Sequence, residues 1–575
     1  MYARLILGWI GVTAPLVLWL APMWLGFSPQ RRQSDRFLVD EDIWLYAGVT
    51  AALFSLVFAH RFLGAAARRF RRPIPPILFV TVLALAVVAI GGLGSWMVFS
   101  GYGLSRDEDL ARFGAQMLAD GQLWSPVAAP WRPFVAALAP EFVRFSSGGA
   151  FWQPAYLPVN AALQALGGLA GAAALVNPLL AAVAVIAAFA VGRRLWPDRS
   201  DLALVAAVLV ASSSQVLTTA MTAYAMTAHL AFNLVWLWLH LRGGRGGHLG
   251  ALIMGFLACG LHQLIFHPLF VAPFILQLWL GRRWALAGLY TAAYAGMGVF
   301  WLEFPTLSLA WCGGAAATAG GVAGLPGQVV ALVGGARPPT VRSMAENLLR
   351  FAVWQNLLLV PLAAAGVAPA WRAGGAWRAL CGGIAVTTVA MAVLMPYQGH
   401  GWGYRYWHGL IGSFALIAAF AWGRLTDGLA PQPRQAAGAV FAIASAASLT
   451  VLFPIEAAMA HAFVRPYARA YRAIRAAPVG VVIVDPGSGW YIDDLVRNSP
   501  DLANRPLVLR GPGLTPTAAA TLCQKYSVAE LDGPDARRFG IRASAVPGPD
   551  DLWAQARCGL GRAKAMQLAP AAGSP

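Results

Sequence analysis

Charged residues are scarce in this chain. Asp, Glu, Lys and Arg make up 11% of its 575 residues, whereas hydrophobic residues make up 58% and the mean hydropathy is +0.61. In soluble domains about a quarter of the residues are charged, so this scarcity excludes an ordinary soluble fold. We expect an α-helical polytopic membrane protein.

Acidic residues and cysteines are scarcer still. The chain has 24 Asp and Glu against 42 Lys and Arg, which gives a net charge of +18, and it has five cysteines. A nucleic-acid-binding protein would gather its basic residues on one exposed face, whereas these stand in short clusters between apolar segments. We therefore expect no nucleic-acid partner. No two cysteines form a C-x-x-C pair, so the common zinc and redox motifs are excluded.

What the sequence has in abundance is apolar runs of about 20 residues, the length of a membrane-crossing helix. The basic clusters fall on alternate connections, of which HRFLGAAARRFRRP (60–73) is the richest. Cytoplasmic loops retain Lys and Arg, so the pattern predicts a multi-pass protein of the bacterial inner (plasma) membrane with a cytoplasmic N-terminus. Residues 100–173, 398–409 and everything after 457 are then periplasmic. We expect about thirteen spans, near residues 5–27, 43–62, 77–99, 174–192, 202–219, 226–241, 249–267, 268–281, 285–303, 348–368, 379–396, 408–423 and 436–455.

The large periplasmic loop opens on three consecutive carboxylates, Asp107, Glu108 and Asp109, in the stretch SRDEDLARFGAQMLADGQL. Apolar residues follow at helical spacing, which predicts a juxtamembrane helix. The S-x-x-E pattern that starts at Ser105 is a capping box, and it accounts for Glu108 but not for Asp107. A helix dipole holds such a carboxylate ionised, and an ionised carboxylate can accept the proton of an incoming hydroxyl.

Several motifs occur in a defined order along the predicted outer side. The Asp-Glu pair opens the first large loop and precedes a helix containing ARFGAQMLADGQL, then comes the proline-bearing FWQPAYLP (151–158), and a late loop contains the pair Arg405-Tyr406. In this combination the sequence resembles the GT-C membrane glycosyltransferases, especially the protein O-mannosyltransferases and the lipid A aminoarabinose transferases. Those enzymes take a sugar from a polyprenyl-phosphate carrier. Two features depart from the family: its Lys-Pro-Pro is Gln153-Pro154-Ala155 here, and the second outer loop, 212–229, has no acid.

The resemblance implies roles for individual residues. Asp107, with Glu108 beside it, would act as the general base, and Arg405 would bind the donor phosphate. The donor-binding group would also include His400, Tyr404, Tyr406 and His408 of the loop QGHGWGYRYWHG (398–409), together with Gln153. The alternative for this loop is an interfacial belt of Trp and Tyr at headgroup depth.

Three histidines and one acid form a weaker set of candidates: His229, His262, His267 and Glu303, each near the predicted outer end of a span. The histidines could converge and bind a divalent metal or the donor phosphate. The alternative is separate polar residues that face the bundle interior with ordinary hydrogen-bond partners. The sequence requires no cofactor, and this divalent metal is the one metal we consider.

The composition changes after about residue 457, which divides the chain into a membrane domain (1–456) and an extramembrane domain (457–575). Strand and helix signals alternate in the second, from VGVVIVD to PDARRFG, and predict a small α/β domain with a parallel sheet and a frayed tail. Its segment DPGSGW is a poor match to a nucleotide-binding glycine motif. Cys523 and Cys558 lie on the oxidising side, so we expect them to form a disulfide, with two free buried thiols as the alternative.

These expectations combine into one function. The chain is expected to be an inverting glycosyltransferase that moves a sugar from a polyprenyl-phosphate donor to a hydroxyl of a glycan, lipid or protein acceptor in the cell envelope. Its partners would be that donor, that acceptor and the lipid bilayer. Two alternatives stay open. One is a transporter or flippase of a lipid-linked glycan, and the other is a ligase or polymerase whose donor carries a pyrophosphate.

Overall fold

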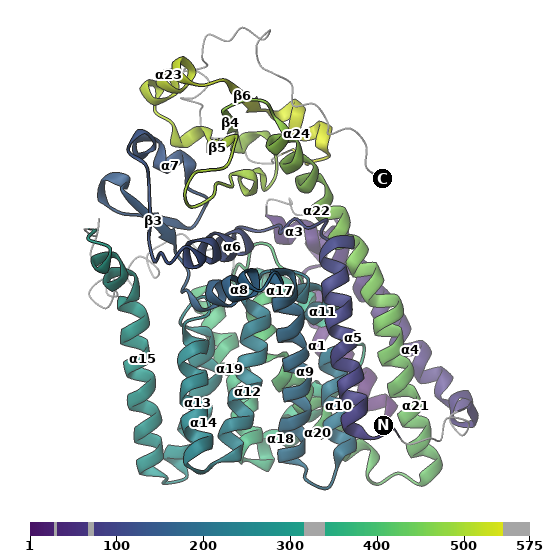
Figure 1. The fold of residues 1–575 in the computed structure, drawn as a ribbon. Coiled ribbons are helices and arrows are strands. Elements are labelled where there is room, and N and C mark those ends of the chain that lie inside the picture. The colour runs from purple at the N-terminus through teal and green to yellow at the C-terminus, as the bar shows by residue number, and fades with distance from the viewer. Residues whose placement is uncertain (28–31, 67–73, 315–339, 544–575) are drawn as a thin grey trace. The chain divides into compact units, whose positions relative to one another are not determined.

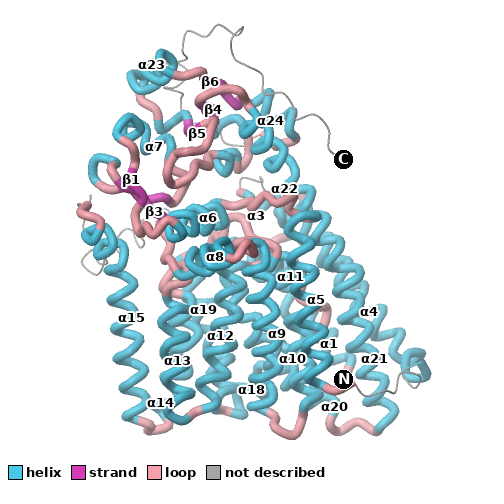
Figure 2. Tube along the Cα trace, in the orientation of Figure 1, coloured by secondary structure: helices cyan, strands magenta, loops and turns pink. Residues whose placement is uncertain are grey.

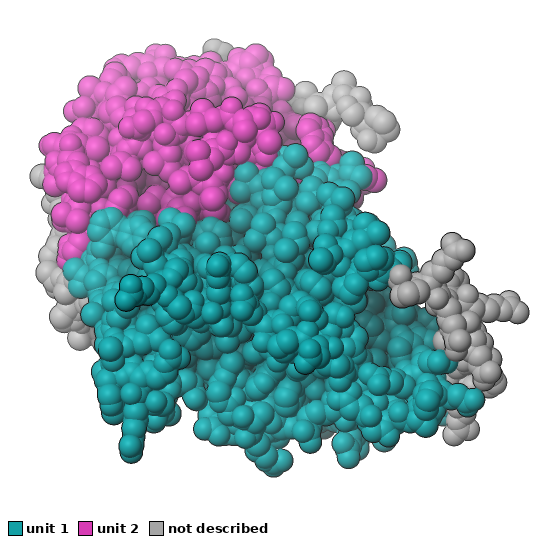
Figure 3. Space-filling view, turned by 60° about the horizontal axis from the view of Figure 1, so that its bottom comes forward, with its two compact units in different colours: residues 1–94, 174–301, 326–459 teal, residues 95–173, 302–325, 460–575 magenta. Residues whose placement is uncertain are grey.

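The computed structural model describes residues 1–27, 32–66, 74–314 and 340–543, and most of these are helical (Figure 1). The chain divides into two compact units, coloured separately in Figure 3. The units group residues by contact, whereas the predicted domains group them by side of the membrane, so the units do not test that prediction. Unit 1 consists of Met1–Gly94, Ala174–Trp301 and Pro326–Met459, and unit 2 of Ser95–Ala173, Leu302–Leu325 and Ala460–Pro575.

Unit 1 is built almost entirely from helices. In the described residues these are α1 (Tyr2–Trp19), α2 (Ala21–Trp24), α3 (Gln33–Phe37), α4 (Ile43–Ala66), α5 (Pro76–Met97), α9 (Val176–Leu195), α10 (Ser200–Ala211), α11 (Ser214–Ala220), α12 (Ala225–Arg242), α13 (Gly244–Cys259), α14 (Phe266–Leu280), α15 (Trp284–Trp311), α17 (Thr340–Val353), α18 (Leu359–Ala373), α19 (Gly375–Leu394), α20 (Ile411–Thr426), α21 (Pro431–Ala447) and the start of α22 (Phe453–Ala476). The ends of α5 and α15 and most of α22 belong to unit 2. α9 packs on α10 and α12, and α12 packs on α13. Packing also joins distant parts of the sequence, because α14 contacts α19, α18 contacts α20, and α1 contacts α18.

The apolar helices confirm the prediction of a membrane protein. Among the described residues, eight helices are long and apolar enough to cross a membrane, or nine if α10 and α11, which meet at an angle of 56°, form one span. Large apolar side chains on these helices are exposed, such as Ile77 and Leu85 of α5 at 75% and 63%. Such a surface suits lipid rather than water. α12, α13 and α14, which coincide with predicted spans, are not among the eight.

Two predicted span boundaries are wrong. The predicted span 348–368 contains the end of α17 and the start of α18, and the break between them includes Asn356. The amide of Asn356 donates to Ser212 Oγ at 2.7 Å, so polar side chains stabilise an interruption that hydropathy alone does not show. The second error concerns Glu303. α15 continues to Trp311, so Glu303 lies inside the helix, half-buried, and not at its end.

The first part of unit 2 is the predicted large loop, which is well structured. α6 (Arg106–Ala119) is the predicted juxtamembrane helix, and it buries Leu110, Phe113 and Met117 as their spacing predicts. The strands were not predicted because each is only two to four residues long. Figure 2 shows them in magenta, in the antiparallel order β1-β3-β2. The remaining elements are α7 (Val135–Leu138), α8 (Val159–Leu169), β1 (Ser125–Pro126), β2 (Val143–Phe145) and β3 (Phe151–Pro154).

The second part of unit 2 contains the parallel sheet that the C-terminal sequence predicts. β4 (Val481–Val484) lies between β5 (Leu507–Arg510) and β6 (Val528–Leu531), with Ile483 opposite Leu509 and Glu530. One apolar core, which includes Phe113, Trp152 and Leu509, joins this sheet to α6 and to the antiparallel sheet. The helices here are α23 (Pro516–Lys525) and α24 (Gly533–Phe539).

Two C-terminal predictions concern single segments. DPGSGW contains a short turn in which the Asp485 side chain accepts hydrogen bonds from Gly487 N and Ser488 Oγ. This acid therefore stabilises its own turn. Cys523 is disulfide-bonded. Cys558 lies outside the described residues, so the pairing of these two cysteines stays a prediction.

Candidate functional site

The first turn of α6 separates the roles of its carboxylates. Ser105 precedes the helix, and its Oγ accepts a hydrogen bond from the backbone N of Glu108 at 3.2 Å. The Glu108 side chain is fully buried, with an exposed fraction of 0%. The Ser105 side chain therefore caps the helix and supplies one of the two hydrogen bonds of the predicted capping box.

Asp107 takes a different contact. Its Oδ1 accepts a hydrogen bond from the Tyr156 hydroxyl at 2.5 Å, and the residue is 8% exposed. Tyr156 comes from the FWQPAYLP segment between β3 and α8, and α8 packs on α6. The fold of the loop thus brings two of the quoted motifs together at one carboxylate. Sequence reasoning quoted this segment for its prolines and missed the tyrosine within it.

Gln153 lies in the same segment. It is part of β3, opposite Arg144 of β2, and is 5% exposed. Neighbouring strand residues point to opposite faces of a sheet, so Gln153 and Trp152 face opposite ways. Trp152 lies in the apolar core of unit 2. The structure therefore places Gln153 on the other face, close in sequence to Tyr156.

In unit 1 the predicted donor-binding residues share one loop, between α19 and α20. α17 holds this loop at several points: Asn347 Nδ2 donates to Pro396 O at 2.9 Å, and Arg350 Nε donates to Gly401 O at 3.0 Å. The Tyr404 hydroxyl lies 3.8 Å from Met344 Sδ, also on α17. This amphipathic helix was missed because hydropathy assigned its second half to a membrane span.

The loop has one glycine that its packing requires. Gly403 has φ +69°, and an added Cβ would lie 2.5 Å from the side chain of Gln215. Gln215 Nε2 donates to Tyr404 O at 2.9 Å and fixes the loop from α11. Tyr404 is fully buried, and burial raises the pKa of its hydroxyl far above the ordinary value. Tyr404 is therefore a neutral structural residue of this loop.

Arg405 is the half-buried cation of the loop. Its backbone N donates to Gln398 Oε1 at 3.0 Å, and its Nη2 donates to the Tyr406 hydroxyl at 3.3 Å. The guanidinium carbon also lies 5.0 Å from the centre of the Tyr406 ring. Tyr406 in turn packs on Phe266 of α14, with 5.6 Å between ring centres. Arg405 is thus oriented by the tyrosine that follows it.

Phe266 brings the predicted histidines to this pair. The ring of His229 lies 5.4 Å from Phe266, and that of His262 lies 6.1 Å from it. His229, in the first turn of α12, is 2% exposed and His262 is 6% exposed. The structure therefore groups Tyr406 and two of the three histidines around one phenylalanine, and Arg405 contacts this group through Tyr406.

His267 and His408 also lie within electrostatic reach of His229, whereas His400 lies beside Tyr224. His267 Nδ1 lies 2.7 Å from Asn233 Oδ1, and its Nε2 lies 2.9 Å from the Tyr294 hydroxyl, so both ring nitrogens have ordinary partners. His400 Nδ1 lies 3.4 Å from the Tyr224 hydroxyl. His408 is fully buried. His267 thus matches the structural alternative given for this set.

The residues do not fit a metal ion. Among the described residues, no three His, Cys, Asp or Glu side chains are arranged to hold one. Both ring nitrogens of His267 are already engaged, one by the amide of Asn233 and one by the hydroxyl of Tyr294. We therefore derive no step through a metal.

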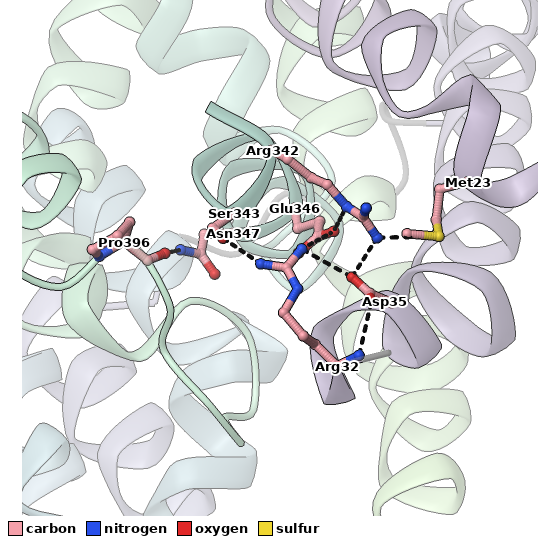
Figure 4. Close-up of polar contacts among 8 residues, drawn as sticks. All are labelled: Met23, Arg32, Asp35, Arg342, Ser343, Glu346, Asn347 and Pro396. Atoms are coloured by element: carbon pink, nitrogen blue, oxygen red, sulfur yellow. Dashed lines mark hydrogen bonds and ion pairs between the residues drawn. The ribbon is translucent and has the colours of Figure 1, made fainter. Parts of the chain in front are cut away.

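Two ionic clusters tie the N-terminal segment to α17. In the first, drawn in Figure 4, Asp35 accepts from Arg342 Nη2 at 2.7 Å and from Arg32 Nη2 at 3.0 Å. Glu346 accepts from Arg342 Nε at 3.1 Å. The two cations and two carboxylates alternate, and both carboxylates are at most 3% exposed. This cluster fixes the start of α17 on α3.

The second cluster is centred on Arg350, one turn from Glu346 on the same helix. Arg350 Nη1 donates to Asp42 Oδ1 at 2.8 Å and to Glu41 Oε2 at 3.1 Å. Its guanidinium carbon lies 4.2 Å from the ring centre of Phe37. Arg342, Glu346 and Arg350 recur every four residues, a signal that could have revealed α17 as a helix with one charged face.

The predicted site residues belong to two units. Asp107, Glu108, Gln153 and Glu303 lie in unit 2, and Arg405, its loop neighbours and the histidines lie in unit 1. Within unit 2 the structure brings Asp107 to Tyr156. Within unit 1 it brings Arg405 to Tyr406, and it brings Tyr406, His229 and His262 to Phe266.

No protein-family model and no curated protein matches the sequence. Among solved structures, the chain is similar to ArnT from Cupriavidus metallidurans in the apo state, with 14% identity, a TM-score of 0.44, and coverage of 75% of this chain and 85% of that one. For the same protein bound to undecaprenyl phosphate, the identity is 16%, the TM-score is 0.38, and the match covers 73% of this chain and 85% of that one. The chain is also similar to the archaeal oligosaccharyltransferase AglB from Archaeoglobus fulgidus, in complex with an inhibitory peptide and a dolichol-phosphate. Here the identity is 13%, the TM-score is 0.40, and the match covers 73% of this chain and 64% of that one. Both proteins are members of the GT-C superfamily, which the sequence resembles. Because every TM-score is below 0.5, the functional argument rests on this chain's own residues.

Proposed function

We propose that this chain is an inverting glycosyltransferase of the bacterial inner membrane, which transfers a sugar from a polyprenyl-phosphate carrier to a hydroxyl acceptor on the periplasmic face. The observation that supports it best is the Asp107 carboxylate, which begins α6 and accepts the Tyr156 hydroxyl at 2.5 Å. The helix cap is made by Ser105 and Glu108, so capping does not explain Asp107.

The contact with Tyr156 suits a general base. A carboxylate has about four lone-pair sites, so the hydrogen bond from Tyr156 orients it and is compatible with a further bond from a substrate hydroxyl. The helix N-terminus favours its ionised form. In the proposed step Asp107 takes the proton of the acceptor hydroxyl while that oxygen bonds to the anomeric carbon. The bond from this carbon to the phosphate oxygen breaks, polyprenyl phosphate leaves, and the anomeric configuration inverts.

The leaving phosphate needs a cation. Arg405 suits this role, because a guanidinium recognises phosphate through paired hydrogen bonds and is always charged. The bond from its backbone N to Gln398 holds the main chain, and the bond from Nη2 to the Tyr406 hydroxyl orients the guanidinium.

The first prediction tests Asp107. Cells lacking the gene would be complemented with the parent chain or with Asp107→Asn, and their cell-envelope glycans compared by mass spectrometry. We expect a sugar that depends on the parent chain to be lost with Asp107→Asn, because removal of a general base costs about 10²- to 10⁴-fold. Tyr156→Phe should give an intermediate rate, since it keeps the ring and removes the orienting hydroxyl.

The matched control is Asp120→Asn, which changes an exposed carboxylate at the other end of α6. It should transfer like the parent at equal amounts of membrane protein. Near-normal transfer by Asp107→Asn would contradict the proposed base and leave Asp107 a structural partner of Tyr156.

The second prediction tests Arg405. Arg405→Ala in purified protein should weaken binding of a polyprenyl-phosphate sugar by about tenfold or more, because a charge-assisted contact is lost. Arg405→Lys keeps the charge without the paired hydrogen bonds of the guanidinium, so its donor affinity should lie between those of the parent and Arg405→Ala. Arg424→Ala, at the exposed far end of α20, is the control. The role is wrong if Arg405→Ala binds the donor as tightly as the parent.

A further inference from the structure

Unit 2 contains a cavity of about 330 Å³ that none of the roles above uses. Its wall is made by α6, by the second half of α22, and by the segment 497–504 that leads into β5. All of these belong to unit 2. The volume lies at the lower end of the range for small-molecule pockets, about 300 to 1,000 Å³.

The cavity is strongly basic. Four arginines line it, Arg112, Arg472, Arg475 and Arg497, against one carboxylate, Asp109. Arg497 is committed to the fold, because it pairs with Asp494 and its Nη2 donates to Gly103 O at 2.6 Å. The other three are exposed. Within the described part of the chain, none of these three has a carboxylate within 4.0 Å.

Hydrogen bonds within the fold hold the rest of the cavity wall. The groups that it presents to a ligand are hydrogen-bond donors. Asn498 Nδ2 donates to Leu138 O and Val508 O, at 2.8 and 2.7 Å, and Asn504 Nδ2 donates to Asn498 Oδ1 at 3.2 Å. These amides are satisfied by the fold. Tyr471 lines the cavity with its half-buried ring and hydroxyl. Three guanidinium groups and a phenol on a fixed wall suit a ligand that is rich in acceptor oxygens and negatively charged.

The cavity is separate from the proposed base. An α-helix turns by about 100° per residue, so Asp109, Arg112 and Gln116 share one face of α6, and Asp107 lies about 200° around the helix from Asp109. The cavity residues of α6 are on that first face. Tyr156 meets Asp107 on the other.

We propose that this cavity binds a ligand through its phosphate group. Arg472 and Arg475 stand three residues apart on α22, so that both guanidinium groups reach one phosphate from the same helix face, and Arg112 reaches it from α6. The phosphate belongs either to a soluble molecule or to the head group of a lipid. Both present the same phosphate to the same arginines. The inference does not depend on the transfer reaction.

The test is binding to the full-length protein in detergent, measured by titration calorimetry with glucose 1-phosphate, inorganic pyrophosphate and, as the neutral control, glucose. We expect the phosphates to bind and glucose not to bind. The double variant Arg472→Gln/Arg475→Gln should bind at least about tenfold more weakly, since it removes two charge-assisted contacts. Arg469→Gln removes an exposed arginine of the same helix that does not line the cavity, and should bind like the parent.

A second arm distinguishes the two sources. In this arm the protein is placed in nanodiscs that contain a phosphorylated glycolipid, and nanodiscs of phosphatidylcholine alone are the control. If the ligand is a lipid head group, the parent should retain the glycolipid, and the double variant of Arg472 and Arg475 should lose it. Binding of the soluble phosphates without retention of the lipid identifies a soluble phosphate as the ligand. Equal weakening by Arg469→Gln, or no phosphate binding in either arm, overturns the proposal. Asp107→Asn should bind phosphate like the parent, so a failure of the transfer proposal would leave this result intact.

Discussion

The arginines of the two units are used in opposite ways. In unit 1, Arg350 meets Asp42 and Glu41 at 2.8 and 3.1 Å, and it is 3% exposed at its side chain. In unit 2, Arg472 and Arg475 are exposed at a cavity and meet no carboxylate in the described residues. The chain has 42 basic and 24 acidic residues, so acids are too few to pair with every arginine.

The positions of the few acidic residues therefore distinguish the arginines that hold the fold from those that can bind a ligand. Asp35, Asp42 and Glu346 are buried beside the arginines of α17, and fix that helix to the N-terminal segment. A buried charge is tolerated only when it is paired, so these arginines cannot leave their partners for a ligand. The cavity arginines have no such constraint. The same residue type thus supports the fold in one unit and is available to bind an anion in the other.

The third prediction tests the arginines that are paired with carboxylates. Arg350→Met should destabilise the protein by about 3 to 5 kcal/mol, because it leaves Asp42 and Glu41 buried without their cation. Arg475→Met should change stability by no more than about 0.5 kcal/mol, as expected for an exposed side chain. Thermal unfolding of both purified variants in the same detergent measures the difference.

A compensating variant keeps this test informative if Arg350→Met does not fold. Arg350→Met/Asp42→Asn removes the cation and one buried carboxylate together, and should recover part of the lost stability. Equal stability of the parent and Arg350→Met would contradict the structural role of this cluster. A large loss with Arg475→Met would show that the cavity arginines are structural too.

Much of the fold follows from the sequence by local rules. Apolar runs locate the membrane helices, the spacing of Leu110, Phe113 and Met117 gives α6, and alternating signals give the parallel sheet. The short strands β1 to β3 do not follow, because two to four residues cannot establish a period. α17 was divided between a loop and a span because hydropathy averages its charged face with its apolar face.

The candidate site was predictable only as separate residues. Asp107 stands out because Ser105 and Glu108 explain the helix cap without it. Its partner Tyr156 is 49 residues away, and only the packing of α8 on α6 joins them. Phe266 likewise connects Tyr406 with His229 through packing between helices distant in the chain. Sequence patterns show neighbours within one element, and contacts of this kind arise between elements.

Asp109 shares features of both sets of residues, because it lines the basic cavity and is also paired with an arginine, at 3.8 Å from Arg497 Nε. Burial raises the pKa of its carboxyl to about 6, although Arg497 and Arg112 oppose that rise and Asp494 adds to it. In the unfolded chain the pKa of Asp is about 3.9. Between these values the folded protein holds a proton that the unfolded chain releases, so protonation stabilises the fold.

The last prediction is therefore a pH dependence of small size. The stabilisation from Asp109 should be complete below about pH 4 and lost as the pH rises through 6, amounting to at most about 3 kcal/mol. Asp109→Asn cannot titrate, so its melting temperature relative to the parent should rise by a few degrees between about pH 4.5 and pH 7. Asp120→Asn, which changes the exposed acid at the end of α6, should keep a constant difference from the parent. If Asp109→Asn also keeps a constant difference, the carboxylate is ionised across this range and belongs with the paired acids of unit 1.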